Sequence, residues 1–195
     1  MPTATLANPL SRLLAVPAAV LVLAACQDKD LTNPTDSAVA VPTPASAEAV
    51  RPWEGSYVST APGVLIAPGA AGAEERCTAQ GLFTLRTVLE GRATHVGHFT
   101  AETSNCTAFP IPGPVDIVDG RIVITAANGD QILSSYSGRQ DVVDPATGAA
   151  RFEVENVITG GTGRFADAAG WDDNSGSINF QTGLLAGQFE GRISY

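Results

Sequence analysis

Short runs of alternating apolar and polar residues, bounded by turn residues, dominate residues 53–195, where helical spacing of apolar residues is nearly absent. In the run GLFTLRTVLEG, Phe83, Leu85 and Leu89 fall on one face and the charged Glu90 falls on the other. A two-residue period of this kind is typical of a strand with one buried face. The pattern therefore predicts an all-β domain.

Turn residues separate these runs at the spacing of β-hairpins. Asn128-Gly129 lies between two alternating runs, and glycine there supplies the positive φ of a tight turn. A second turn is predicted at DPATG, and GSINFQTGLLAGQFEGRISY closes the chain as a hairpin. Further strands are predicted at Trp53–Ser59 and Val115–Val118.

These segments add up to about eight short antiparallel strands, the pattern of an up-and-down barrel or a sandwich. Residues 53–195 are 143 positions, enough for one domain with its own core. The last strand runs to Tyr195, which suits closure of a barrel better than a free edge. We therefore expect a single antiparallel barrel over 53–195, after a signal peptide and a flexible linker.

The segment before this domain has the features of an export signal. Residues 1–25 hold one basic residue, Arg12, and an apolar run shorter than the roughly 20 residues that span a bilayer. The run ends in LAAC, residues 23–26, which resembles the lipobox of bacterial lipoprotein signal peptides. The resemblance implies cleavage before Cys26 and acyl chains such as palmitate on this residue. The alternative is an ordinary secretory signal followed by a chance cysteine.

Residues 26–52 are rich in Pro, Ala, Ser and Thr and contain no aromatic residue, which predicts a disordered tether. The expected location is the cell envelope, with the membrane as partner through the lipid anchor. Gln27, rather than aspartate, follows the cysteine. By the sorting rule of Gram-negative bacteria this favours the outer membrane.

The chain is acidic, with a net charge of −9 at pH 7, and loss of Arg12 on cleavage would leave 10 basic and 20 acidic residues. This charge argues against nucleic acid as a partner. Cys77 and Cys106 remain as a pair, for which an oxidising compartment favours a disulfide. This disulfide would join the approach to the first long strand to the loop after the second. Two buried free thiols are the alternative.

The stretch TGGTGRFADAAG, residues 159–170, allows two interpretations. Gly161, Gly163 and Ala166 have the G-x-G-x-x-A spacing of a dinucleotide-binding turn, but that turn must open a helix, and no helical pattern follows. We therefore predict a corner between two strands, in which glycines allow the turn and Phe165 packs beneath it. The structural residues of this corner are Gly160, Gly161, Gly163, Phe165 and Gly170.

The same stretch, as GGTGRFADAAG, resembles the G-G-T-G-x-F-x-x-A-x-G motif of plant dirigent proteins and, more loosely, that of allene oxide cyclases. The resemblance covers residues 81–195 and implies an eight-stranded antiparallel, calycin-like barrel. Ala169 stands where dirigent proteins commonly have arginine, and their catalytic residues do not align with this chain. No catalytic residue is carried over.

The residues that could form a metal or catalytic site have simpler structural interpretations. His95 and His98 would point to opposite faces of a strand, so we expect no metal site. Asp172 and Asp173 are a candidate carboxylate pair, but beside Asn174, Ser175 and Gly176 they favour a solvated turn. We expect no cofactor.

The barrel interior offers another kind of site, because barrels of about eight strands either fill with side chains or hold one small ligand. Four polar residues share the apolar faces of their strands and are candidates to line a cavity: Thr87, Ser134, Tyr136 and Asn156. Side chains that only satisfy one another would give the same pattern. The first functional hypothesis is a non-catalytic module that binds a small apolar ligand or an envelope protein. The second is a cyclase-like, isomerase-like or dirigent-like enzyme acting in the cavity.

Overall fold

A computed structural model describes residues 49–108 and 113–195, so the predicted signal peptide, Cys26 and most of the predicted tether lie outside the described residues. The strands are β1 (Arg51–Ser59), β2 (Val64–Ile66), β3 (Phe83–Ala93), β4 (Gly97–Thr107), β5 (Val115–Ala126), β6 (Gln131–Gln140), β7 (Ala149–Gly161), β8 (Ala169–Asn179) and β9 (Leu184–Ser194). Two short helical turns accompany them, α1 (Glu75–Thr78) and the 3₁₀ turn η1 (Gly163–Phe165). No helix in the described part of the chain is long and apolar enough to cross a membrane.

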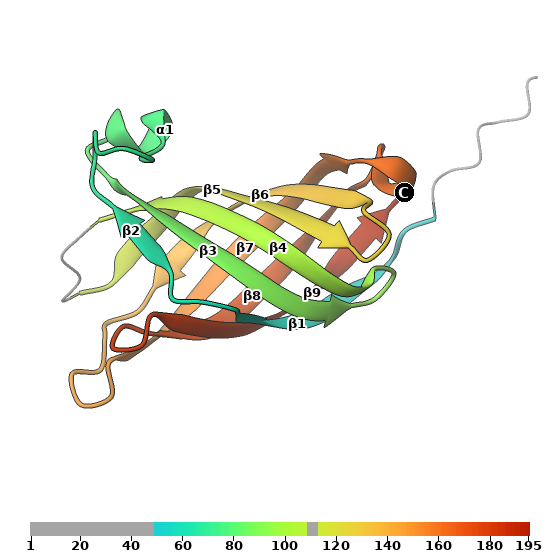
Figure 1. Ribbon diagram of the computed structural model, residues 1–195. Coiled ribbons are helices and arrows are strands. Elements are labelled where there is room, and N and C mark those ends of the chain that lie inside the picture. Colours follow the sequence, from blue (N-terminus) through green and yellow to red (C-terminus); the bar gives the residue numbers. More distant parts are fainter. Residues whose placement is uncertain (1–48, 109–112) are drawn as a thin grey trace, which may run out of the picture. The chain divides into compact units, whose positions relative to one another are not determined.

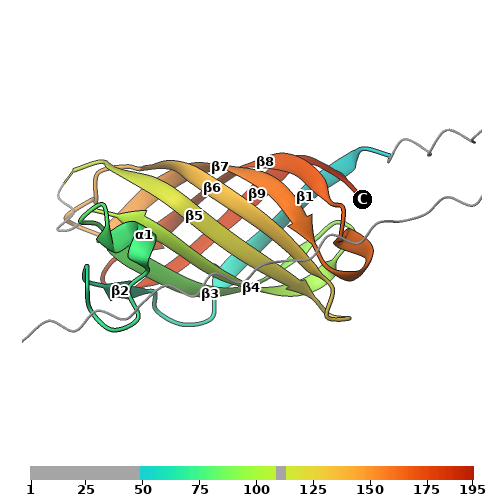
Figure 2. The ribbon, with the colours of Figure 1, turned by 90° about the horizontal axis from the view of Figure 1, so that it is seen from above.

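Eight of these strands form a closed antiparallel barrel, and β2 is an additional strand (Figures 1 and 2). From β3 to β9 each strand pairs with the next, and β1 closes the barrel between β9 and β3. The prediction of an all-β domain with a single barrel of about eight strands is confirmed.

One edge of β3 is shared by two strands. Gly55–Ser59 of β1 pairs with Leu89–Ala93, and Val64–Ile66 of β2 pairs with Thr84–Arg86. The chain therefore leaves the barrel wall briefly between β1 and β2 and then returns to the same edge. Pairing along both halves of β3 leaves little of this edge open to another chain.

The two ends of the barrel differ in what fills them. At the end where β1 begins and β9 finishes, here called the core end, large apolar side chains pack together: Trp53, Phe99, Ile132, Phe165 and Ile193. The opposite end, here called the cavity end, carries α1 and the first residues of β3 (Figure 1). β1, the first strand of the described chain, begins at the core end (Figure 1).

The glycine-rich stretch closes the core end as a corner between β7 and β8. Gly160 and Gly163 have φ of 145° and 59°, conformations that favour glycine. Phe165, the last residue of η1, is fully buried in the core, while Gly161 ends β7 and Gly170 lies in β8.

The carboxylate of Asp130 occupies the position that a phosphate would need. A Cβ at Gly163 would overlap this carboxylate, and the backbone amide of Arg164 donates to it at 3.5 Å. The corner interpretation agrees with this geometry, because an anion already sits against the turn and no long helix follows it.

The structure corrects three local predictions. His95 lies in the turn between β3 and β4 with φ of 67°, not on a strand. Val115–Val118 is the first part of the longer β5, which continues through an irregularity at Asp119, where φ is 50°. Cys106 lies within β4 rather than in the loop after it. Sequence alternation finds regular strand segments, but it does not show where a bulge joins two of them.

Candidate functional site

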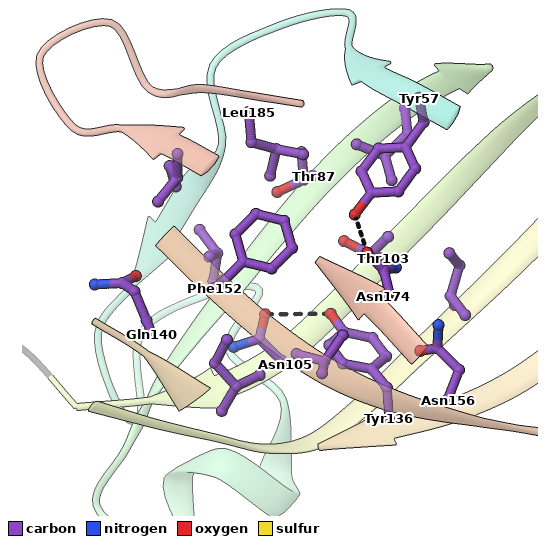
Figure 3. Close-up of a pocket in the computed structure, with 16 residues that line it drawn as sticks. Tyr57, Thr87, Thr103, Asn105, Tyr136, Gln140, Phe152, Asn156, Asn174 and Leu185 are labelled. Atoms are coloured by element: carbon purple, nitrogen blue, oxygen red, sulfur yellow. Dashed lines mark hydrogen bonds between the residues drawn. The ribbon is translucent and has the colours of Figure 1, made fainter. Parts of the chain in front are cut away.

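A cavity lies inside the barrel at its cavity end, and every one of the eight barrel strands contributes to its wall (Figure 3). The space open to the centre of a water-sized sphere is about 80 Å³. One water molecule needs about 10–15 Å³ on this measure, so there is room for several waters or one small organic molecule.

Among the residues that the structure describes, half of those in the cavity wall are apolar and none is acidic, basic or a histidine. Eight of its sixteen side chains are apolar: Leu85, Leu89, Ile117, Ile122, Phe152, Val154, Ile178 and Leu185. The other eight are uncharged polar groups: Tyr57, Thr87, Thr103, Asn105, Tyr136, Gln140, Asn156 and Asn174. Most of the surface that these side chains expose to the cavity is nevertheless apolar, and a mainly apolar surface with placed polar groups is typical of small-molecule sites.

Two hydroxyl–amide pairs organise the polar part of the wall (Figure 3). The Tyr57 hydroxyl donates to Asn174 Oδ1 at 2.7 Å, and the Tyr136 hydroxyl donates to Asn105 Oδ1 at 3.3 Å. Burial raises the pKa of Tyr136 to about 12 and raises the pKa of Tyr57 further. Both phenols are therefore neutral donors at physiological pH.

The tyrosine rings fit because glycines face them from neighbouring strands. A Cβ at Gly120 would overlap the ring of Tyr136, and one at Gly187 would overlap the ring and hydroxyl of Tyr57. The rings consequently lie against backbone, which leaves the space beside them open.

Gln140 is the exception among the polar wall residues. It ends β6 opposite Phe152 of β7, and only 7% of its surface is exposed. Its Nε2 is buried and has no hydrogen-bond partner within the described residues. A buried amide donor without an acceptor is costly to the fold, and is rare.

Asp172 lies one layer below the cavity, toward the core end. Its carboxylate accepts one hydrogen bond from Trp53 Nε1 at 3.1 Å and another from Asn156 Nδ2. Burial raises the pKa of Asp172 to about 6, more than these two donors lower it. Asp172 lines a small void of about 10 Å³ beneath the cavity and does not line the cavity itself.

The prediction of a solvated turn at Asp172–Gly176 is wrong. These residues lie inside β8, with Asp172 and Asn174 facing the barrel interior and Asp173 and Ser175 facing outward. A strand whose inward residues are polar shows no apolar alternation, so its sequence resembles a turn.

The four candidate cavity residues fall in two places. Thr87, Tyr136 and Asn156 line the cavity, whereas Ser134 lies deeper and lines the small void with Asp172. The sequence analysis did not select five other polar wall residues: Tyr57, Thr103, Asn105, Gln140 and Asn174. Gln140 lies on the same face of β6 as Ser134 and Tyr136, so the alternation that selected those two residues could have found it.

A disulfide fixes α1 to the barrel at the cavity end. Cys77 of α1 is bonded to Cys106 of β4, as predicted, and both residues are fully buried. Arg76 donates to Ser104 Oγ at 2.9 Å and to the carbonyl oxygen of Asp119, so the helical turn is held on β4 and β5. These contacts flank Asn105 and support the part of the wall that holds Tyr136.

Within residues 49–108 and 113–195, no three His, Cys, Asp or Glu side chains are grouped so that they could hold a metal ion. His98 lies on the outer face of β4 and His95 lies in a turn, where its Nε2 is 2.9 Å from the carbonyl oxygen of Pro52. No protein-family model matches this chain, and comparisons with curated proteins and with solved structures yield no significant match.

Proposed function

We propose that this protein is a lipid-anchored envelope protein whose barrel binds one small, mostly apolar molecule without changing it chemically. The observation that carries the proposal is the cavity, which has wall residues from all eight barrel strands, half of them apolar and none charged. The interior of a barrel of this size either fills with side chains or holds one ligand. Here the core end is filled, and the cavity end is not.

The anchor is supported by the sequence LAAC at residues 23–26, in which Cys26 would carry the lipid. The chain enters the barrel at the core end, so the cavity would open at the end remote from the tether. Gln27 favours the outer membrane, and the partner of the cavity would be a small apolar molecule or part of an envelope protein. The proposal includes the resemblance to allene oxide cyclases and dirigent proteins. This resemblance rests on the sequence GGTGRFADAAG and on the barrel.

The test is binding of uncharged one-ring compounds, such as ethylbenzene and acetophenone, followed by NMR of the isotope-labelled protein. We expect saturable shifts of amide signals from cavity residues. Val154→Phe, which places a ring in the cavity, should abolish these shifts and leave the rest of the spectrum unchanged. Absence of saturable binding in the wild-type protein would overturn the proposal.

An isomerase-like or cyclase-like enzyme is the second candidate, and the observation that favours it is Asp172, a buried carboxyl with a raised pKa beneath the cavity. Binding remains the better proposal, because both carboxylate oxygens of Asp172 already accept hydrogen bonds. The rate at which acetophenone exchanges its methyl protons for deuterium in heavy water distinguishes simple binding from catalysis. An acceleration by the wild type that is lost in Asp172→Asn would favour the enzyme.

A further inference from the structure

We infer that the ligand of this cavity is uncharged and carries a hydrogen-bonding oxygen, and that this oxygen pairs with the side-chain amide of Gln140. The inference rests on the proposed function and narrows it to one chemical class, a small neutral molecule with a ketone, ester, ether or amide oxygen on an apolar body.

The charge of the ligand follows from the cavity wall. An anion would lose its hydration and find no basic side chain among the sixteen wall residues. It would also approach the carboxyl group of Asp172, which lies one layer below the cavity and repels an anion when it is ionised. A cation would find no carboxylate on the wall, because Asp172 does not line the cavity and both of its oxygens are occupied. Carboxylates, phosphates and ammonium compounds are therefore poor ligands.

The need for an oxygen follows from Gln140. The Tyr57 hydroxyl is already paired with Asn174 Oδ1, and the Tyr136 hydroxyl with Asn105 Oδ1. The buried Nε2 of Gln140 has no acceptor among residues 49–108 and 113–195. A ligand oxygen within reach would remove this deficit, which an apolar ligand cannot do.

The residues beside Gln140 indicate the shape of the apolar part of the ligand. Phe152 lies opposite Gln140 in the β6–β7 register and also lines the cavity (Figure 3). Ile117 of β5 and Leu185 of β9 add apolar surface. A flat or ring-shaped apolar body against Phe152, with its oxygen directed to Gln140, satisfies both kinds of group.

Three probes of nearly equal size test the inference. They are acetophenone, which is neutral with an acceptor, ethylbenzene, which is neutral without one, and benzoate, which is anionic. Dissociation constants are measured by NMR titration of the wild type, of Gln140→Met and of the control Gln131→Met. Gln131 begins the same strand at the core end, and its amide donates to Thr125 Oγ1 at 3.4 Å.

We expect Gln140→Met to weaken acetophenone binding by about three- to tenfold, the net value of one hydrogen bond, and to leave ethylbenzene within about twofold. Gln131→Met should change neither constant. The side-chain amide signals of Gln140 should shift with acetophenone only. Benzoate should produce no saturable shift at about pH 8, where it is fully ionised.

The outcomes separate this inference from the proposed function. If ethylbenzene and acetophenone both bind and respond equally to Gln140→Met, the cavity binds ligands but Gln140 is satisfied by water, and the inference is wrong. Binding of benzoate comparable to that of acetophenone would also overturn it. If none of the three probes binds, the proposed function fails as well.

Discussion

Replacement of Phe165 by alanine tests the most specific structural claim, that the glycine-rich stretch is a corner held by one buried ring. Phe165 is fully buried, and its ring packs edge-to-face on Tyr195 with centroids 4.8 Å apart. The guanidinium of Arg164 lies 4.6 Å from the centre of the same ring. The alanine variant would lose all three contributions.

The expected loss of stability is large. Truncation of a buried phenylalanine costs about 3–5 kcal/mol, and a paired aromatic ring adds about 0.5–1.5 kcal/mol beyond its burial. The corner is tied to the ends of β7 and β8, which limits collapse into the space left by the ring, so we expect the upper half of the first range. For a domain of this size the corresponding fall in melting temperature is roughly 10–15 °C.

The assay is thermal and urea unfolding of Phe165→Ala beside the neighbouring variant Arg164→Ala. Arg164 is exposed, lies 3.7 Å from the Asp130 carboxylate and donates to the His95 carbonyl oxygen at 2.5 Å. Exposed pairs of this kind contribute about 0–1 kcal/mol, so its removal should cost about 1 kcal/mol or less. Added nucleotide should change no melting temperature. Two results would refute the corner interpretation. One is a nucleotide-dependent rise in melting temperature that is lost in Arg164→Ala, and the other is a Phe165→Ala variant that is as stable as the wild type.

Three further predictions concern the cysteines and the buried carboxyl. Cys26→Ser should abolish metabolic labelling with fatty acid, and labelling that persists in this variant would exclude Cys26 as the lipid site. Peptide mapping without reductant should recover the linked Cys77–Cys106 pair, and its removal by a double alanine substitution should lower the free energy of unfolding by about 3.5 kcal/mol in the chain-entropy model. Asp172, whose pKa is raised from 3.8 to about 6, binds its proton more tightly in the folded protein, so stability should fall by about 3 kcal/mol as the pH rises through this window. The free energy of unfolding of Asp172→Asn, measured with urea from about pH 4 to pH 7, should not show this fall. If the variant shows the same fall as the wild type, other groups cause it.

The barrel could be predicted from the sequence because local signals agree with one another. Alternation of apolar residues marks the strands, and glycines with positive φ mark their connections, as at Gly129, where φ is 89°. The corner at Gly160–Gly163 could be distinguished from a phosphate site by the absence of a helical pattern after it. Each of these signals lies within a few residues of the feature that it predicts.

The polar interior could be predicted only in part. Thr87, Tyr136 and Asn156 share strand faces with apolar residues, but the hydrogen-bond partners inside the barrel are distant in sequence. Asp172 is 119 residues from Trp53 and 16 from Asn156, and Tyr57 is 117 from Asn174. Before these strands are placed side by side, an inward Asp or Asn is indistinguishable from a solvated one. The run WDDNSG therefore predicts a turn on local grounds, although it lies within β8 and directs Asp172 and Asn174 into the barrel.

The same distant pairs explain why the cavity end stays open. An apolar wall can relax into a void, because its side chains lose nothing specific when they move. The pairs Tyr57–Asn174 and Tyr136–Asn105 lose a buried hydrogen bond if either partner moves inward, and that loss costs about 1–3 kcal/mol. Asn105 is further fixed by its neighbour Cys106, which the disulfide ties to α1. The cavity is therefore maintained by the polar groups that line it. It follows that Asn174→Leu, which removes the partner of Tyr57, should reduce ligand binding by collapse of the wall even though it makes the cavity more apolar.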